Sequence, residues 1–494
     1  MSSKLRKHWD DMGHAGLATA QMAAFRHYLA SVVVPFSGHY GKVFSRHGLA
    51  PEQFKSFDDL RRLPFSSKHD LLATPDEPDK ARQFVIEPDP AVLRRRPSTI
   101  ARALLRGKAA AQEALEREFR PVILTSTTGR SSQPVPFIYT HHDLENLNIA
   151  GRRMMELCDS RKEYRHINVF PFAPHLAFWQ MHHAGLAFNT FCLSTGGGKT
   201  MGTEGNVGII ERMKPDALIG MPTFVYHLLQ TAAERGVRWE NLKIIVLGGE
   251  KAPRGMRRKF RQLADALGTG GGLRIMSTYG FTEAKTAWPE CAFGNENEPT
   301  GFHLYPDLGI VEVVDPDTGE QVGEGEPGEI VYTPLDARGT VVLRYQTGDI
   351  IEGGIRYAPC PGCGRRMPRL VGRISRVSNR KEMRFGKVKG TLVDFNELES
   401  ILDDLDGLGA WQIELRKQND DPLEVDELIV HAEAWAGGDP DALKSQIDLR
   451  LLEGAEIKPN QIVFHDAASI RKLQGVGEEL KEKRLVDNRP NPAP

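Results

Sequence analysis

A short segment rich in hydroxyl side chains, TSTTGRSSQP from Thr125 to Pro134, directly follows the apolar run PVIL. Backbone N–H groups, hydroxyl donors and a cation on one turn are the groups that hold phosphate oxygens, so the segment is a candidate anion site. Serine and threonine are also typical of ordinary turns. Taken alone, the segment leaves both interpretations open.

A second group of residues has the chemistry of a metal site. Cys360 and Cys363 form a C-x-x-C pair in a Pro/Gly-rich stretch, and Cys291 and His303 lie in an earlier segment. Four ligands of the Cys₃His type satisfy a tetrahedral structural Zn²⁺, which would clip the two segments together. Reduced thiols and a redox pair are the alternatives. The five cysteines are an odd number and no secretion signal is apparent, so a disulfide framework is not expected.

Two glycine-rich segments resemble phosphate-binding motifs but fail the patterns. The run that ends in Gly198-Lys199-Thr200 has Leu193 where a P-loop requires its first glycine. The run that begins at Gly268 has Leu273 where a dinucleotide-binding motif requires its last glycine, and it follows a helical pattern rather than a strand. Neither segment predicts a nucleotide site.

The elements that must position these residues change in type along the chain. Residues 1–120 are mostly of helical pattern and contain a basic run, Arg94 to Arg96, which we expect to be solvated. From Pro121 onward, strand-like runs such as RHINVFPF and LKIIVLGG alternate with helix-like runs such as FVYHLLQTAAERG. This alternation predicts an α/β fold with a largely parallel sheet. Residues 309–358 combine β-rich runs with Asp-Pro, Thr-Gly and Pro-Gly turn signals, which favour antiparallel strands.

The length and composition set further limits. At roughly 150 residues per domain, 494 residues predict two to four compact units. We expect an N-terminal helical region at 1–120 packed on a large domain, the core of that domain at 121–373, and a small α+β domain at 374–494. The 64 basic and 65 acidic residues nearly cancel, so the global charge favours no nucleic acid partner. No apolar run approaches 18 residues, so we expect no membrane partner and a cytoplasmic location.

Four further segments follow the hydroxyl-rich one in a fixed order: Leu247-Gly-Gly-Glu250, Tyr279-Gly-Phe-Thr-Glu283, Tyr345-Gln-Thr-Gly-Asp349 and Gly372-Arg373. A basic ending, KEKRLVDNR at 481–489, completes the set. In this order, from about Pro121 to Pro490, the sequence resembles the acyl-adenylate-forming superfamily, and within it the phenylacetate–CoA ligase branch. The resemblance implies an α/β fold: a large N-terminal domain with mixed β-sheets flanked by helices plus a β-rich subdomain, and a small mobile α+β C-terminal domain.

The resemblance also implies a two-step reaction. A carboxylate attacks the α-phosphate of ATP to form an acyl-adenylate and diphosphate, and a thiol, usually that of coenzyme A, then displaces AMP. Charge develops on phosphorus, so cations and fixed donors should dominate the site. Mg²⁺ would be required, because it is a hard cation that prefers oxygen ligands. A cysteine and a histidine recur in this branch near the positions of Cys291 and His303, which favours the zinc interpretation.

By the same resemblance, each segment acquires a role. Tyr279 would stack on adenine, Asp349 would accept both ribose hydroxyls, and Lys481 would bridge the carboxylate and the α-phosphate. The other residues follow: Ser126, Thr127, Thr128 and Gly129 for the β- and γ-phosphates with Arg130 beside them; Gly249 and Glu250 for the purine; Gly280 for the nucleotide; Thr282 for the α-phosphate; Glu283 for Mg²⁺; and Arg373 for ribose or phosphate. The aromatic segment 169–188 corresponds to the acyl pocket, with Phe172, Trp179 and His183 as candidates to line it around a flat aryl acid.

The sequence departs from the family pattern at several of these places. Ser126 stands where a glycine is usual, Arg130 lies near the place of a lysine, and Ser375-Arg376 replaces the acidic pair expected at the hinge. Leu480 replaces the glycine before the catalytic lysine, and a basic stretch follows the hinge. The leading hypothesis is an AMP-forming ligase that joins an aromatic or arylacetic acid to coenzyme A, acting as a possible homodimer. The alternatives are an acyl-adenylate enzyme with an amine or carrier-protein thiol as acceptor, and a catalytically impaired, zinc-stabilised nucleotide-binding homologue.

Overall fold

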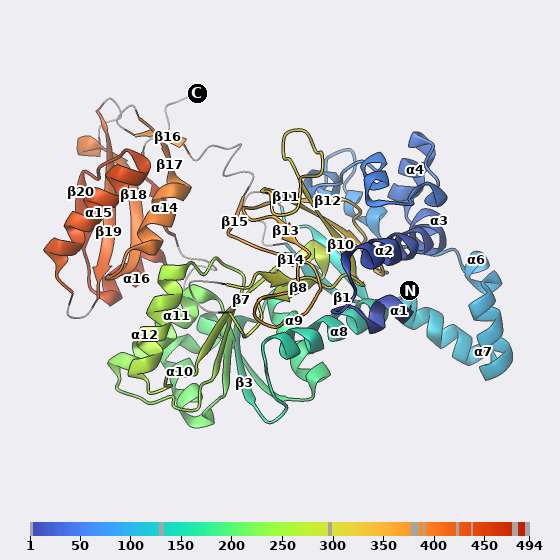
Figure 1. The fold of residues 1–494 in the computed structure, drawn as a ribbon, viewed down its shortest axis with the longest axis horizontal. Helices are drawn as coiled ribbons and strands as arrows, with labels where there is room; N and C mark the ends of the chain where they lie inside the picture. Colours follow the sequence, from blue (N-terminus) through green and yellow to red (C-terminus); the bar gives the residue numbers. More distant parts are fainter. Residues whose placement is uncertain are drawn as a thin grey trace. The chain divides into compact units, whose positions relative to one another are not determined.

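The computed structural model describes residues 3–127, 133–294, 299–376, 385–388, 391–420, 424–435, 438–476 and 483–489. Within these ranges the chain forms two compact units, each assembled from two separate stretches of sequence (Figure 1). The first unit contains residues 1–194 and 276–375, and the second contains residues 195–275 and 376–494. The domain boundaries expected from the sequence, at residues 120 and 373, stay a prediction.

The first unit begins with seven helices. They are α1 (Ser3–Lys7), α2 (His14–Tyr28), α3 (Val34–Phe36), α4 (Gly38–His47), α5 (Lys68–Leu71), α6 (Pro90–Arg95) and α7 (Pro97–Phe119). Helix α4 illustrates the local cause: the Ser37 side chain accepts the Tyr40 N–H at its start, and Gly48, with a left-handed φ of 60°, ends it. Buried aromatic side chains such as Phe25 and Phe54 fill the space between the helices. The helical pattern expected for this region is confirmed.

One expectation for this region is wrong at a single residue. Arg94 and Arg95 are exposed as expected, but the Arg96 side chain is only 19% exposed and pairs with Glu118 at 3.5 Å. Its guanidinium also lies over the ring of Phe119, 5.4 Å from the centroid. A run of like charges cannot show which member turns inward, because that depends on an acid and an aromatic ring far along the chain.

The middle of the first unit carries the hydroxyl-rich segment on a hairpin. Its elements are β1 (Pro121–Ser126), β2 (Pro136–Thr140), α8 (His141–Leu157), β3 (Arg165–Pro171), α9 (Leu176–Phe188) and the start of β4 (Phe191–Gly196). Strands β1 and β2 pair in antiparallel fashion, with Ser126 opposite Pro136. A capping box starts α8, in which Thr140 accepts the Asp143 N–H and the Asp143 carboxylate accepts the Thr140 N–H.

The second stretch of the first unit is rich in strands. They are β7 (Arg274–Phe281), β8 (Thr286–Pro289), β9 (Phe302–His303), β10 (Gly309–Val314), β11 (Gly328–Pro334), β12 (Tyr345–Ile351), β13 (Ile355–Arg356), β14 (Arg369–Leu370) and β15 (Ile374–Arg376), with one turn of 3₁₀-helix, η5, at Thr282–Ala284. Strands β10, β11 and β12 form an antiparallel meander, as the turn signals predict. Strand β8 turns back along β7, and Tyr279 lies opposite Trp288.

The second unit joins an α/β segment to a small α+β domain. The first part contains α10 (Gly197–Met213), β5 (Ala217–Gly220), α11 (Pro222–Glu234), β6 (Ile244–Leu247) and α12 (Arg254–Ala266), with β5 and β6 parallel. The second part contains β16 (Phe385–Val388), β17 (Thr391–Asp394), α14 (Phe395–Asp404), β18 (Leu408–Lys417), β19 (Asp426–Ala434), α15 (Pro440–Ala455), β20 (Gln461–Phe464), α16 (Ala467–Gln474) and β21 (Leu485–Asp487). Its four-stranded sheet has the order β20-β19-β18-β21.

Helix α12 packs closely on the small α+β domain inside the second unit. A Cβ at Gly255 would collide with the Asp403 carbonyl oxygen, so glycine is required for this approach. One turn later the buried Lys259 ammonium donates to the Gly409 carbonyl at 3.0 Å. Burial lowers the pKa of Lys259 from its ordinary 10.5 to about 8.

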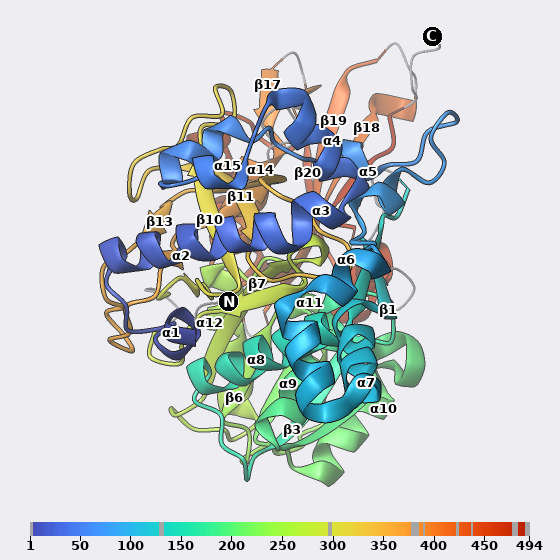
Figure 2. The same cartoon turned by 90° about the vertical axis from the view of Figure 1, so that its right-hand side faces the viewer.

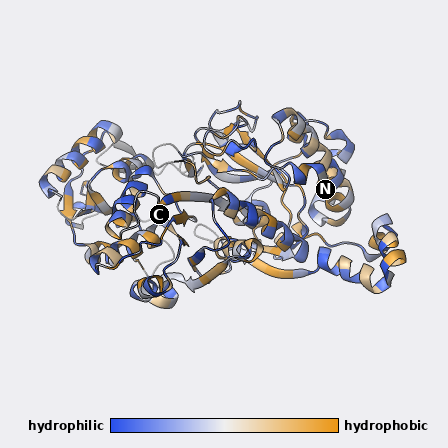
Figure 3. Ribbon diagram, turned by 60° about the horizontal axis from the view of Figure 1, so that its bottom comes forward, coloured by the Kyte–Doolittle hydropathy of each residue, from blue (hydrophilic) through white to orange (hydrophobic). Residues whose placement is uncertain are grey.

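The mixed α/β architecture expected from the sequence is confirmed. The ribbons of the helices in Figure 3 carry alternating hydrophilic and hydrophobic bands, which is the pattern that places one face of a helix on a core. Among the described residues, no helix combines the length and the apolarity that crossing a membrane requires.

Candidate functional site

Strands β7 and β12 bring two of the motif segments into contact. The Tyr279 hydroxyl on β7 donates to Asp349 Oδ2 on β12 at 2.9 Å. Asp349 is only 6% exposed, and its backbone N–H donates to the Thr347 hydroxyl at 3.0 Å. A nearly buried carboxylate thus has a fixed orientation, which a residue in a solvated turn would lack.

Glu283, in the η5 turn, is held by Tyr345 from strand β12. The Tyr345 hydroxyl donates to Glu283 Oε1 at 2.7 Å, and the Tyr345 ring stacks on Phe281 with centroids 6.5 Å apart. The motif order pointed to Glu283 but gave Tyr345 no role. Strand alternation could not have found it, because β12 departs from regular pairing with β11 between Gln346 and Ile350.

A buried ion pair lies directly behind this turn. The Lys285 ammonium donates to Asp143 Oδ2 at 3.1 Å, and the two side chains are 7% and 2% exposed. Asp143 also accepts backbone N–H groups from Thr140, Arg338 and Gly339. Burial raises the pKa of Asp143, but Lys285 and these backbone donors outweigh it and hold the pKa below its usual value. The pair fixes the chain two residues after Glu283, and sequence reasoning missed it.

The hydroxyl-rich segment is described only up to Thr127. The Ser126 N–H donates to the Pro174 carbonyl at 2.7 Å, and the Thr127 N–H donates to the Val135 carbonyl at 3.1 Å. The Thr127 hydroxyl accepts the Val135 N–H at 3.0 Å, so it closes the base of the loop. Three predicted phosphate ligands, Thr128, Gly129 and Arg130, lie outside the described residues, as does the predicted catalytic Lys481.

The remaining predicted nucleotide residues lie in two different units. Arg373, in the first unit, pairs with Glu352 at 3.0 Å and its side chain is 67% exposed. Gly280 lies on β7 next to Tyr279, and Thr282 begins η5. Gly249 and Glu250 lie in the second unit after β6, where Gly249 has a φ of 81° and Glu250 accepts the Thr223 hydroxyl at 2.6 Å.

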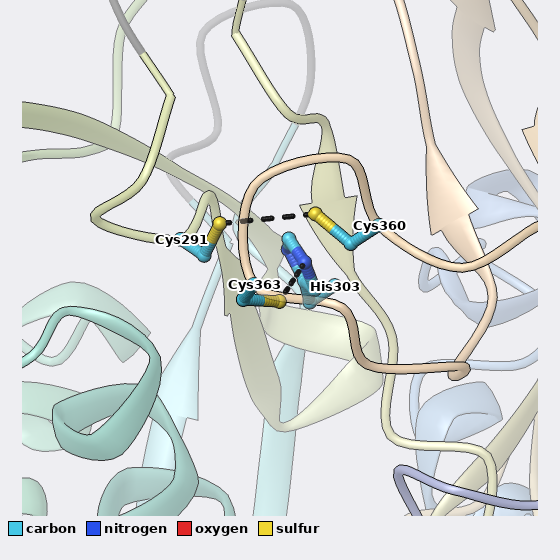
Figure 4. A group of neighbouring side chains, drawn as sticks. All are labelled: Cys291, His303, Cys360 and Cys363. Atoms are coloured by element: carbon cyan, nitrogen blue, oxygen red, sulfur yellow. Dashed lines mark hydrogen bonds between the residues drawn. The ribbon is translucent and has the colours of Figure 1, made fainter.

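The four residues predicted to bind zinc come together in the first unit (Figure 4). Cys291 Sγ lies 3.8 Å from Cys360 Sγ, and Cys363 Sγ lies 3.4 Å from His303 Nε2. All four ligand atoms lie within 4.8 Å of one another. A tetrahedral ion with bonds of about 2.3 Å to sulfur and about 2.1 Å to nitrogen requires S···S and S···N separations of about 3.8 and 3.6 Å. The donor set therefore fits Zn²⁺ in both chemistry and spacing.

The surroundings of this cluster also suit a metal. His303 Nδ1 lies 3.0 Å from the Gly301 carbonyl oxygen, to which it donates, and this fixes Nε2 as the nitrogen that faces the thiols. Interactions with Cys291 and then with Cys363 lower the pKa of the Cys360 thiol, whereas interactions with Cys291 and then with Cys360 raise that of Cys363, so Cys360 is the thiol that loses its proton most readily. Strand β14 pairs with β9, with Arg369 opposite His303, and brings the two segments side by side.

The predicted acyl-pocket residues belong to one aromatic cluster on α9 and the turn before it. The rings of Phe172 and Phe178 meet edge to face with their centroids 5.3 Å apart, and the centroids of Phe178 and Trp179 are separated by the same distance. Trp179 lies 6.4 Å from His183, whose Nδ1 lies 2.8 Å from the Asn148 side-chain oxygen. Burial, and then the neighbouring His182, lowers the pKa of His183, so the ring is neutral at neutral pH. Phe172 is 55% exposed, so the cluster has an open edge.

Comparison with known proteins decides the family. The sequence profile described as "AMP-binding enzyme" matches residues 87–334, which is half of the chain. The chain belongs to the family of AMP-binding enzymes. The resemblance inferred from the motif order is confirmed: the profile supports the acyl-adenylate-forming superfamily, and relatives named phenylacetate-coenzyme A ligase support that branch.

Individual relatives agree with this assignment. The chain is 26% identical over 347 residues to the phenylacetate-coenzyme A ligase of Thermus thermophilus, an alignment that covers 69% of the chain and 66% of the relative. It is 22% identical over 411 residues to the phenylacetate-coenzyme A ligase of Escherichia coli, covering 80% and 77%. The chain thus spans slightly less than two thirds of the Thermus enzyme.

Solved structures support the fold. A crystal structure of 2-hydroxyisobutyryl-CoA ligase in the postadenylation state, in complex with R3-HIB-AMP, superposes with a TM-score of 0.73 and covers 99% of this chain and 94% of that one. The sequence identity in that comparison is 19%, so the likeness concerns the fold alone.

Proposed function

We propose that this chain is an AMP-forming acid–CoA ligase that acts through an acyl-adenylate on an aromatic or arylacetic acid. The observation that carries the proposal is the pairing of Tyr279 with Asp349 and of Tyr345 with Glu283 at the junction of β7, η5 and β12. Two short motifs far apart in sequence thus meet through oriented carboxylates, of which Asp349 is buried and Glu283 is partly exposed, in a chain of the AMP-binding family. The names of the phenylacetate-coenzyme A ligase relatives supply the acceptor and the substrate class.

The residues suit the handling of a nucleotide. Asp349, held by the Tyr279 hydroxyl, presents acceptor oxygens suited to the ribose hydroxyls, with the Tyr279 ring beside the base. Glu283, held by Tyr345, would bind Mg²⁺, which offsets the charge of the phosphates when bound. Ser126 to Arg130 would hold the β- and γ-phosphates, Thr282 the α-phosphate, and Arg373 the ribose or a phosphate. Gly249 and Glu250 would line the purine, and Gly280 would lie against the nucleotide.

The chemistry then requires two substitutions, first at phosphorus and then at carbon. The substrate carboxylate forms a bond to the α-phosphorus while the bond to diphosphate breaks, and Lys481 would steady the two anions during that step. The thiol sulfur of coenzyme A then forms a bond to the acyl carbon, AMP leaves, and the thiol proton passes to solvent. The open aromatic cluster of Phe172, Trp179 and His183 would receive the acid by ring stacking.

An ATP–diphosphate exchange assay over a panel of aryl, arylacetic and short aliphatic acids tests the proposal. We expect exchange that depends on Mg²⁺ and is fastest with an aromatic acid. Asp349→Ala should reduce it by ~10²-fold or more, because a contact to the nucleotide is lost, whereas Asp317→Ala, a change in an exposed turn, should not. If none of the acids supports exchange in protein shown to be folded, the proposal is contradicted.

The identity of the acceptor is tested separately. The altered hinge at Ser375-Arg376 favours considering an amine or a carrier-protein thiol in place of coenzyme A. Product analysis with and without coenzyme A separates the cases: acyl-CoA and AMP in equal amounts support the ligase, whereas an acyl-adenylate that accumulates unchanged in the presence of coenzyme A supports another acceptor.

We further propose that Cys291, His303, Cys360 and Cys363 bind one structural Zn²⁺. The ion would hold the 291–303 segment against the turn between β13 and β14. Metal analysis of protein purified without chelator should give one zinc per chain, and Cys363→Ser should lower both the zinc content and the thermal stability. Cys192→Ser, which removes a thiol outside the cluster, is the control. A zinc content near zero in the wild type would refute this part.

A cytoplasmic location, a homodimer and domain boundaries at 120 and 373 also remain proposals.

A further inference from the structure

The first half of α7 stands away from the core of its unit. Between Pro97 and Ala110 no side chain of the helix is buried, and its buried residues are Ala111 and Phe119 in the second half. Gly107, with φ 85° and ψ 162°, breaks the helix between the two halves. Figure 1 shows α7 projecting beyond the other N-terminal helices, and Figure 2 shows α6 and α7 in the foreground of that side.

This projecting half exposes large apolar side chains. Leu104 and Leu105 are 81% and 84% exposed, and Ile100 is 47% exposed. At 100° per residue, Ile100, Leu104 and Leu105 occupy one arc about 140° wide on the helix, which is the width of a stripe that helices normally bury. Single exposed apolar residues are common on protein surfaces, but two adjacent leucines with this exposure form a patch. Such patches mark interaction sites, so we expect the stripe to have a partner.

The charges around the stripe are of one sign. Residues 90–112 contain six cations, Arg94, Arg95, Arg96, Arg102, Arg106 and Lys108, and no aspartate or glutamate. Arg96 pairs with Glu118, whereas the other five form no ion pair with any acid in the described part of the chain. Arg102 and Arg106 fall on the side of the helix opposite to the apolar arc. The segment is therefore a basic amphipathic helix in a chain whose net charge is -1.

We propose that the first half of α7 docks on the surface of an anionic phospholipid bilayer. Helices that lie in a membrane interface place leucines on one face and arginines or lysines on the other, and the cations attract anionic headgroups. A second copy of this chain would cover the leucines but would bring no anions to the arginines, because residues 90–112 of that copy contain no aspartate or glutamate either. Nucleic acid would match the charge but would leave the leucines exposed, and the segment has no aromatic side chain to stack on bases.

The proposed contact is with the membrane surface and requires no spanning helix. It revises the expectation from the sequence that the protein has no membrane partner. The C-terminal end of α7 is held to the rest of the unit by two ion pairs: Arg117 pairs with Glu145 on α8 at 2.9 Å, and Arg338 pairs with Glu118 at 2.9 Å. The projecting half can then meet a surface without disturbing the core, because it contributes no buried side chain.

Flotation of the full-length protein with vesicles tests the proposal. We expect binding to vesicles of equal parts phosphatidylcholine and phosphatidylglycerol, little binding to pure phosphatidylcholine, and release as salt is raised. Leu104→Ser with Leu105→Ser should weaken binding by ~10-fold or more through the lost apolar contact. Arg102→Gln with Arg106→Gln should weaken it by about 25-fold, at about fivefold for each cation.

The control is Leu449→Ser with Leu452→Ser, a pair of leucines 53% and 51% exposed on α15, which should bind vesicles as the wild type does. Light scattering and an electrophoretic shift with single-stranded RNA complete the experiment. Absence of vesicle binding, vesicle binding that the α7 variants leave unchanged, a dimer that dissociates in the leucine variant, or RNA binding that depends on Arg102 and Arg106 in place of lipid binding would each overturn the proposal. Diphosphate exchange in the variants reports folding independently.

Discussion

The buried pair of Lys285 and Asp143 gives the sharpest prediction about the candidate site. Lys285→Met removes the cation and leaves the Asp143 carboxylate 2% exposed without its charged partner. Removal of one member of a buried pair costs about 3–5 kcal/mol of the free energy of unfolding. Because Lys285 lies two residues after Glu283, the loss should also displace the η5 turn and slow diphosphate exchange. The exposed pair of Arg117 and Glu145 is the matched control, since Arg117→Met should cost about 0–1 kcal/mol.

A double-mutant cycle makes the test specific to the pair. Asp143→Ala should cost at least as much as Lys285→Met, because the backbone N–H groups of Arg338 and Gly339 also lose their acceptor. The double variant should cost about 2 kcal/mol less than the sum, since neither charge is then left alone. Urea unfolding followed by tryptophan fluorescence measures the free energies, and hydrogen exchange of the 282–290 segment reports its local opening. Costs that add to within about 0.5 kcal/mol would refute the reasoning.

Three further predictions follow from named contacts. Tyr279→Phe removes the hydroxyl donor to Asp349, and we expect the KM for ATP in diphosphate exchange to rise about 5–10-fold with a smaller change in kcat. Trp179→Ala should raise the KM for the aryl acid and leave that for ATP unchanged, and equal effects on both would contradict the pocket assignment. Lys259 has its pKa lowered to about 8 in the fold, so the unfolded chain binds more protons between pH 8 and 10.5 and stability should rise with pH across that window. In thermal melts Lys259→Met should remove this rise; a rise that persists would assign it to another group.

Much of the fold follows from periodicity. Strands such as β5 and β6 are short, wholly apolar and bounded by turn residues, so their pattern identifies them without further information. The cluster of Cys291, His303, Cys360 and Cys363 can also be predicted from the sequence, because a C-x-x-C pair together with a separate cysteine and histidine is typical of zinc sites. The Asp349 and Glu283 positions depended instead on the order of motifs, since neither residue has a distinctive neighbourhood in the sequence alone.

Other features depend on contacts that no local pattern encodes. Asp143 and Lys285 are 142 positions apart, and neither stands in a recognisable motif, so only the folded chain brings them together. Arg96, at the start of α7, turned inward for the same reason, toward Glu118 and Phe119 at the other end of that helix and toward Phe36 on α3. The exposed leucines of α7 show the converse case. Their spacing predicts a helix with a buried stripe, and the fold provides nothing to cover it.

The discontinuous second unit has a consequence for synthesis of the protein. Lys259 on α12 contacts the Gly409 carbonyl 150 positions later in the chain. At a translation rate of roughly 5–20 residues per second, a ribosome needs roughly 8–30 s to deliver that partner after α12 has emerged. During this interval the face of α12 that bears Gly255 and Lys259 has no cover from its own polypeptide. Nascent chains halted before residue 376 should therefore engage holding chaperones more strongly than chains that have been completed.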